Sequence, residues 1–146
     1  MSLGARCDVL IVEDNVLQCE EMADFLRRAD LSVEIAYDGA GARDMARLHE
    51  PRVILLDFNL PDMTGVRLAE VLRALLPTAA ILMMSGRIDG LSERTLEALG
   101  ITVFVNKPVP LVPLRTAVLK LVGASRDGQE APQQKGWLGT GVGGRR

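Results

Sequence analysis

The chain has 146 residues, of which 48% are hydrophobic, so we expect one domain with its own core and no need for disulfides or structural metals. The formal net charge of −2 gives no general electrostatic case for nucleic-acid binding. No apolar run approaches the roughly 20 residues of a membrane span, and the first residues do not resemble a signal peptide. Cys7 and Cys19 fall in the first predicted strand and helix, which favours free buried thiols in a reducing cytoplasm.

Short apolar runs alternate with helical periodicities along the chain. Strands are predicted at 8–12, 33–37, 53–56, 80–84 and 101–105. Helices are predicted after the caps Asn15, Thr64 and Ser92, in the stretch from Ala42 to His49, and from about Pro110 to Val122. This alternation predicts an α/β fold, a doubly wound parallel sheet with helices on both faces, because right-handed crossovers leave few other options.

The composition changes after Val122. We therefore predict a folded domain over residues 1–122 and a flexible tail, rich in glycine and without periodicity, over residues 123–146. The only tryptophan, Trp137, falls in this tail. We expect it to be solvated, with docking to a partner as the alternative.

Polar residues stand at four of the predicted strand ends. They are Glu13 and Asp14 after the first strand, Asp57 after the third, Ser85 after the fourth and Lys107 after the fifth. Because the carboxyl ends of parallel strands lie on one edge of a sheet, these side chains can converge on one pocket, where open α/β sheets place their ligands.

The charge of this pocket favours a metal ion. Three carboxylates and one ammonium sum to −2, and carboxylates that cluster without a cation repel each other. Hard oxygen ligands favour Mg²⁺. In the alternative interpretation, Glu13 and Asp14 are only charges that stabilise the start of a helix, and Asp57 only caps a turn.

A metal beside an ionised Asp and a Lys is suited to phosphoryl transfer. The Asp57 carboxylate can act as a nucleophile and become an aspartyl phosphate. The transferred group spreads charge over three oxygens, which Mg²⁺, Lys107 and Ser85 with a backbone amide can each stabilise.

The stretch from about Cys7 to Val122 resembles the receiver domain of two-component response regulators, in particular the single-domain, chemotaxis-regulator-like members. The residues that carry the resemblance are Glu13-Asp14, Asp57 with Pro61 and Gly65, Ser85-Gly86 and Lys107-Pro108. The resemblance implies a flavodoxin-like, five-stranded parallel sheet with strand order 2-1-3-4-5 and five helices.

The resemblance also implies a role for each site residue. Asp57 is the phosphoacceptor, and Asp14 and Asp57 are direct Mg²⁺ ligands. Glu13 acts on the metal mainly through water, and Asn59 offers its backbone carbonyl. Lys107 pairs with the phosphoryl group, and the Lys107-Pro108 bond is expected to be cis.

Two further residues resemble the switch of the family. Ser85 is the hydroxyl that moves to the phosphoryl group, and Phe104 is the aromatic residue that swings inward on activation. Phe104 as plain core is the alternative. On the last helix, Val112 and Leu119 lie seven apart on one exposed side, and we expect them to contact a partner.

The resemblance implies a cytoplasmic signalling switch rather than an enzyme. A histidine kinase or a phosphotransfer protein would donate the phosphoryl group. A downstream protein, or a second copy in a homodimer, would bind the surface of the fourth helix, fifth strand and fifth helix. We expect no effector domain, direct nucleic-acid contact or membrane insertion.

Three rival functions can be compared with this one. An Asp-dependent phosphohydrolase needs an acid at the position of Asn59, and a DNA-binding regulator would need another chain. A degenerate receiver that is never phosphorylated would not need all of the residues named above.

Overall fold

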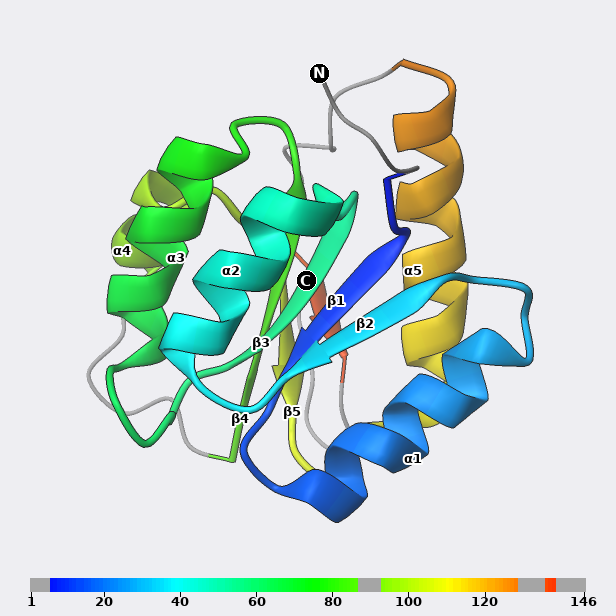
Figure 1. Ribbon diagram of the computed structural model, residues 1–146, viewed down its shortest axis with the longest axis horizontal. Helices are drawn as coiled ribbons and strands as arrows, with labels where there is room; N and C mark the ends of the chain where they lie inside the picture. Colours follow the sequence, from blue (N-terminus) through cyan, green and yellow to red (C-terminus); the bar gives the residue numbers. More distant parts are fainter. Residues whose placement is uncertain (1–5, 87–92, 129–135, 139–146) are drawn as a thin grey trace.

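The computed structural model describes residues 6–86, 93–128 and 136–138 of the chain, which form a parallel sheet between two layers of helices (Figure 1). The strands are β1 (Val9–Val12), β2 (Val33–Ala36), β3 (Val53–Asp57), β4 (Ala80–Ser85), β5 (Ile101–Asn106) and β6 (Gly136–Leu138). The helices are α1 (Val16–Arg27), α2 (Gly39–His49), α3 (Gly65–Leu75), α4 (Glu93–Ala98) and α5 (Leu111–Arg126).

The strand order is β2-β1-β3-β4-β5-β6, and every neighbouring pair is parallel. The first five strands therefore confirm the predicted flavodoxin-like order 2-1-3-4-5. The register aligns the carboxyl ends of the central strands, since Asp57 pairs with Met84 and Ser85 pairs with Asn106. Polar residues at these ends consequently lie on one edge of the sheet.

Alternate residues of each strand enter one of two aliphatic cores, as expected for a sheet that is buried on both faces. Ile11, Leu55 and Val105 pack on the face covered by α1 and α5. Leu56 and Phe104 pack on the face covered by α2, α3 and α4. Figure 1 shows these two layers of helices on opposite sides of the strands.

Side-chain caps fix where the first three helices begin. The side chains of Asn15, Asp38 and Thr64 accept hydrogen bonds from backbone N–H groups in the first turns of α1, α2 and α3. Each cap follows a strand closely, so each helix begins beside the edge that carries the polar strand ends. Ser92, the predicted cap of the fourth helix, lies outside the described residues.

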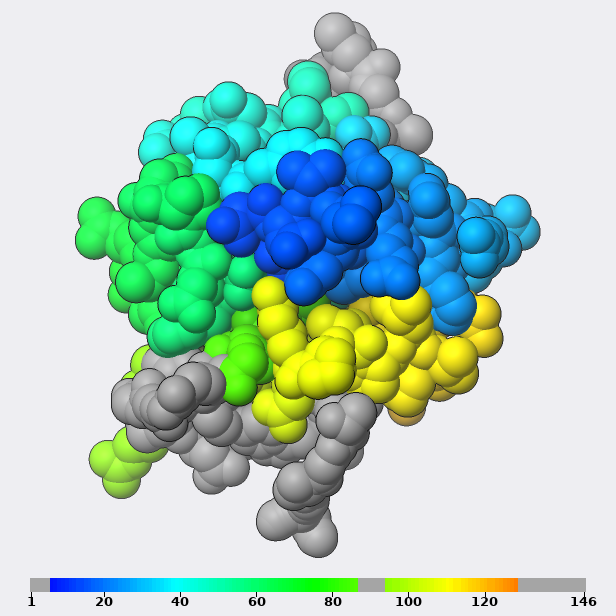
Figure 2. All heavy atoms as spheres, turned by 90° about the horizontal axis from the view of Figure 1, so that it is seen from below, coloured from blue at the N-terminus to red at the C-terminus, as the bar shows by residue number. Residues whose placement is uncertain are grey.

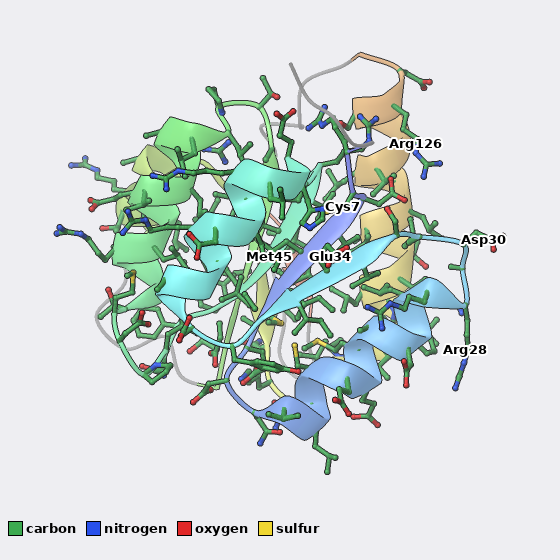
Figure 3. All side chains as sticks on the ribbon, viewed as in Figure 1. Cys7, Arg28, Asp30, Glu34, Met45 and Arg126 are labelled. Carbon is green, nitrogen blue, oxygen red and sulfur yellow. The ribbon has the colours of Figure 1, made fainter. Side chains whose placement is uncertain are left out.

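Two predictions about the carboxyl-terminal part differ from the structure. The last helix was predicted to end at about Val122, where the composition changes, but α5 continues to Arg126. Its last turn is held by an ion pair between Arg126 and the buried Asp8, with 2.8 Å between Nη2 and Oδ2. Figure 3 shows Arg126 near Cys7, which precedes β1. The second difference is β6, a regular strand inside the expected tail.

The expectation of two free, buried cysteines agrees with the structure. Cys7 and Cys19 are free and buried, and burial raises the pKa of each thiol to about 12. None of the helices in residues 6–86 and 93–128 is long and apolar enough to cross a membrane.

Gly65 lets the chain turn tightly after β3. A Cβ at this position would lie 2.7 Å from the carbonyl oxygen of Asp57 and 2.7 Å from the Cα of Phe58, which are both backbone atoms. The Gly65 N–H also donates to the Phe58 carbonyl, at 2.6 Å. The start of α3 is thereby packed directly against the residue that ends β3.

We expect Gly65→Ala to lower the free energy of unfolding by roughly 1–3 kcal/mol, although alanine is the better helix former, because the added methyl group meets backbone. The matched control is Gly123→Ala, because a Cβ at this helical position of α5 meets nothing within 4 Å. This control should raise the stability by up to about 1 kcal/mol. Denaturant titration of both variants provides the measurement, and a shift of the same sign in both would contradict the packing argument.

Candidate functional site

The polar strand ends meet at the carboxyl edge of the sheet. Asp57 ends β3, Ser85 ends β4, Glu13 and Asp14 follow β1, and Lys107 follows β5. Figure 2 views this edge, where segments from the beginning (blue), middle (green) and later part (yellow) of the chain adjoin. The structure therefore brings together the five residues that sequence analysis placed in one pocket.

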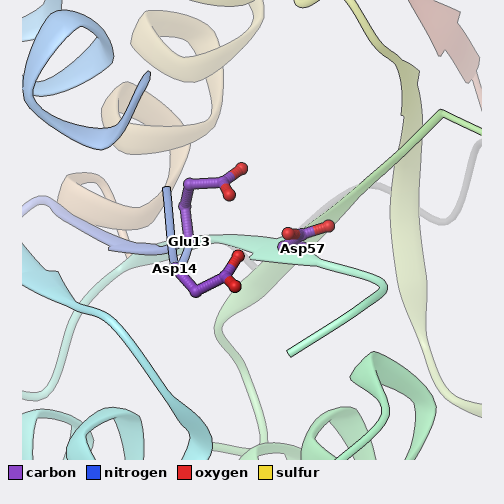
Figure 4. Close-up of side chains that lie close together, drawn as sticks. All are labelled: Glu13, Asp14 and Asp57. Carbon is purple, nitrogen blue, oxygen red and sulfur yellow. The ribbon is translucent and has the colours of Figure 1, made fainter. Parts of the chain in front are cut away.

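Three carboxylates form a cluster at the centre of this edge. One oxygen each from Glu13, Asp14 and Asp57 lies within 4.8 Å of the others (Figure 4). Glu13 and Asp57 are buried, at 1% and 4% exposure, whereas Asp14 is exposed. Two buried carboxylates and a third that faces solvent provide oxygen ligands and leave room for water. This donor set fits Mg²⁺.

The ammonium group of Lys107 lies between the two buried carboxylates. Its Nζ is 2.7 Å from Oε1 of Glu13 and 3.3 Å from Oδ2 of Asp57. The shorter contact is a hydrogen bond to Glu13. One positive charge thus faces three carboxylates, which leaves the formal charge of the cluster at −2.

Burial and the neighbouring charges shift the pKa values of both Asp57 and Lys107. Burial and the negative charge of Glu13 raise the pKa of Asp57 to about 6, although Lys107 and a backbone hydrogen bond from Asn59 oppose the shift. Burial lowers the pKa of Lys107, but its hydrogen bond to Glu13 and the charge of Asp57 outweigh this effect and raise it overall. Lys107 is therefore a cation at neutral pH, while Asp57 is a carboxylate that is easily protonated.

Backbone amides orient the carboxylates. The Asn59 N–H lies 3.3 Å from Oδ1 of Asp57, and the Asn15 N–H donates to Oε2 of Glu13 at 3.1 Å. The Lys107 N–H donates to the Ser85 carbonyl at 2.9 Å, which ties β5 to the fully buried Ser85. The Lys107-Pro108 peptide bond is cis, as expected.

Asp62 contributes to the site region and was missed in the sequence analysis. Its carboxylate accepts hydrogen bonds from the backbone N–H groups of Gly39 and Ala40, at 2.8 and 3.1 Å, at the start of α2. These hydrogen bonds lower the pKa of Asp62, and the bond from Gly39 has the larger effect. The loop that follows Asp57 is thereby fastened to a neighbouring helix. The Pro-Asp-Met-Thr-Gly stretch indicates a loop but not the helix that it contacts.

Three other predicted residues lie outside the carboxylate cluster. Phe104 is already buried, at 2% exposure, in the core on the α3 side of the sheet. Its inward movement on activation remains a prediction. Val112 and Leu119 on α5 are exposed, at 56% and 41%, as their helical spacing indicated.

Comparisons with known proteins point to one family. The profile described as "Response regulator receiver domain" matches residues 9–119. TorR, the TorCAD operon transcriptional regulatory protein of Escherichia coli K12, is 30% identical over 114 residues, which cover 78% of this chain and 49% of TorR. A protein-glutamate methylesterase/protein-glutamine glutaminase of Archaeoglobus fulgidus is 36% identical over 118 residues, which cover 78% of this chain and 34% of that protein.

A solved structure shares the fold. The crystal structure of a CheY-like response regulator receiver domain protein from Methanospirillum hungatei JF-1 has a TM-score of 0.78 and 22% identity, over 84% of this chain and 98% of that chain. The two curated relatives are longer than this chain, which spans about half of one and a third of the other. The matched range runs from β1 into α5 and includes the whole carboxylate cluster. This chain therefore belongs to the response regulator receiver domain family of two-component signalling.

Proposed function

We propose that the protein is a phosphorylation-dependent switch in which Asp57 accepts a phosphoryl group from a histidine kinase or a phosphotransfer protein. The observation that carries the proposal is the position of the Asp57 carboxylate, which lies beside the ammonium of Lys107 and in a cluster with two further carboxylates. An ion pair that served stability alone would not need three anions around one cation. The excess negative charge instead favours a site that takes up a cation and then a phosphoryl group.

Glu13, Asp14 and Asp57, together with the backbone carbonyl of Asn59, would hold Mg²⁺. When bound, the ion supplies positive charge to the oxygens of the transferred group. The raised pKa of Asp57 supports this assignment. Burial and repulsion from Glu13 disfavour its charged form, and a second cation would stabilise that form.

The chain's own residues account for the transfer step. An oxygen of Asp57 forms a bond to phosphorus, while the bond from phosphorus to the donor's nitrogen breaks and its electron pair leaves with the donor. Lys107 then turns from Glu13 and Asp57 to an oxygen of the new phosphoryl group. The short distances of 2.7 and 3.3 Å from its ammonium to these carboxylates support this exchange.

The proposed output is a protein contact. Ser85 stands at the end of β4, next in register to Asn106 of β5, so movement of its hydroxyl to the phosphoryl group would reach the strand that carries Phe104. The surface of α4, β5 and α5, with Val112 and Leu119, would then bind a downstream protein or a second copy. We place this switch in the cytoplasm and assign it no catalytic activity beyond its own phosphorylation and slow dephosphorylation.

The phosphohydrolase alternative has less support. Such an enzyme would need a side-chain acid two residues after the nucleophile, to protonate the leaving group. That position holds Asn59, whose backbone N–H donates to Asp57.

Incubation with acetyl phosphate and Mg²⁺ should phosphorylate the protein once, at Asp57, and a chelator should abolish the reaction. Intact-mass and peptide mass spectrometry provide the measurement. Asp57→Asn should not be labelled, whereas the control Asp44→Asn, at an exposed position of α2, should be labelled like the wild type. Equal labelling of Asp57→Asn and the wild type would contradict the proposal.

The metal-free protein should gain stability from Asp57→Asn. The pKa of Asp57 is about 6 in the folded state against an ordinary value of 3.8, so ionisation disfavours the fold, and the unfolding free energy falls as pH rises through this window. In chelator at pH 7, the variant should be more stable than the wild type by roughly 1–3 kcal/mol. The difference should disappear below about pH 4.

Denaturant titrations of both proteins at pH 4 and pH 7 test this sign. The control is Asp44→Asn, which should change the unfolding free energy by the same amount at pH 4 and at pH 7. A wild type that is more stable than Asp57→Asn at pH 7 without metal would show that the carboxylate cluster is not repulsive.

Ser85→Ala should still be phosphorylated but should signal poorly, because the phosphoryl group would lack the hydroxyl that couples it to β5. The measurement compares the affinity of the downstream partner for the phosphorylated variant and for the phosphorylated wild type. We expect a loss of about fivefold or more, which corresponds to roughly 1 kcal/mol of coupling. Equal affinities would exclude Ser85 from the switch.

A further inference from the structure

The edge of β5 is occupied by the chain's own carboxyl-terminal strand. Gly136–Leu138 pairs in parallel with β5, in the register Val103 with Gly136, Phe104 with Trp137 and Val105 with Leu138. Figure 1 shows this short strand in red beside β5. The matched family profile ends at residue 119, so β6 is an addition of this chain to the receiver fold.

The pairing covers only part of β5. This strand has six residues, Ile101–Asn106, and β6 pairs with three of them, Val103–Val105. A longer extended segment could therefore form more backbone hydrogen bonds along this edge than β6 does. The covered part includes Phe104 and lies just before Lys107, so the edge adjoins both the proposed switch and the phosphorylation site.

We propose that the β5 edge is a strand-docking surface whose resident occupant is Gly136–Leu138, and that a partner adding an extended strand here must first displace this segment. The strand is then an autoinhibitory contact, supplied in cis by the residues that follow α5. This inference goes beyond the proposed function, because it concerns occupancy of the edge and does not require phosphorylation of Asp57.

The physical basis is competition between a tethered and a free strand. Backbone pairing at a sheet edge accepts many sequences, so an unpaired edge invites association with other chains. A strand joined to the domain by a short connection has an effective concentration on the order of millimolar. If β6 is docked about nine-tenths of the time, it weakens a competing strand about tenfold.

Release of β6 can be produced by two adjacent prolines. Alternate residues of a strand direct their N–H groups to the same neighbour, so Trp137→Pro with Leu138→Pro removes whichever N–H of this pair donates to β5. The matched control is Val142→Pro, a proline in the same part of the chain but outside β6. Both variants keep the full chain and every residue of the carboxylate cluster.

The test is binding of a fluorescein-labelled synthetic peptide with the sequence of residues 133–141, followed by fluorescence anisotropy. The peptide should bind the double-proline variant about tenfold or more tightly than it binds the wild type or Val142→Pro, because only the variant has a free β5 edge. A peptide with prolines at the positions of Trp137 and Leu138 should not bind. Similar affinities for all three proteins, or no binding to the variant, would overturn the proposal.

Hydrogen exchange of the β5 amides gives an independent reading. Amides of Val103–Val105 that face β6 should exchange faster in the double-proline variant than in Val142→Pro, while amides of β3 should be unchanged. Unchanged protection in β5 would also overturn the proposal. Labelling of Asp57 by acetyl phosphate should remain intact, which separates a failure of this inference from a failure of the proposed function.

Discussion

The site depends on one interaction, the contact of the Lys107 ammonium with the buried carboxylates of Glu13 and Asp57. These residues come from segments far apart in the sequence, at the ends of β5, β1 and β3. A single ammonium cannot neutralise three carboxylates, so the domain keeps a local excess of negative charge. Burial and this excess of negative charge together raise the pKa of Asp57, and the excess is what favours the divalent cation proposed above.

The parallel sheet brings these residues together, and the loop after Asp57 fixes the position of the Asp57 carboxylate. In-register strands bring the carboxyl ends together, and two aliphatic cores hold the sheet from both sides. Gly65 allows α3 to begin against the backbone of Asp57, and Asp62 fastens the loop to the start of α2. These contacts limit the positions available to the Asp57 carboxylate.

Sequence reasoning predicted what depends on local pattern. The apolar run that ends at Asp57 predicted a buried strand, and polar residues at four strand ends predicted one shared edge. Contacts between distant segments could not be predicted in this way. The preference of Lys107 for Glu13, the bonds from α2 to Asp62 and the ion pair that extends α5 all depend on tertiary packing. β6 was missed because Gly136–Leu138 is too short for periodicity, and its pairing with β5 is a property of the folded edge.

Calorimetric titration with Mg²⁺ tests the central claim, that the carboxylate cluster is built for a cation, most directly. Repeating the titration in buffers of different ionisation enthalpy measures the protons released on binding. Because the pKa of Asp57 is about 6, binding at pH 6 should release about half a proton, and binding at pH 8 almost none. No Mg²⁺ binding, or the same proton release at both pH values, would contradict the account.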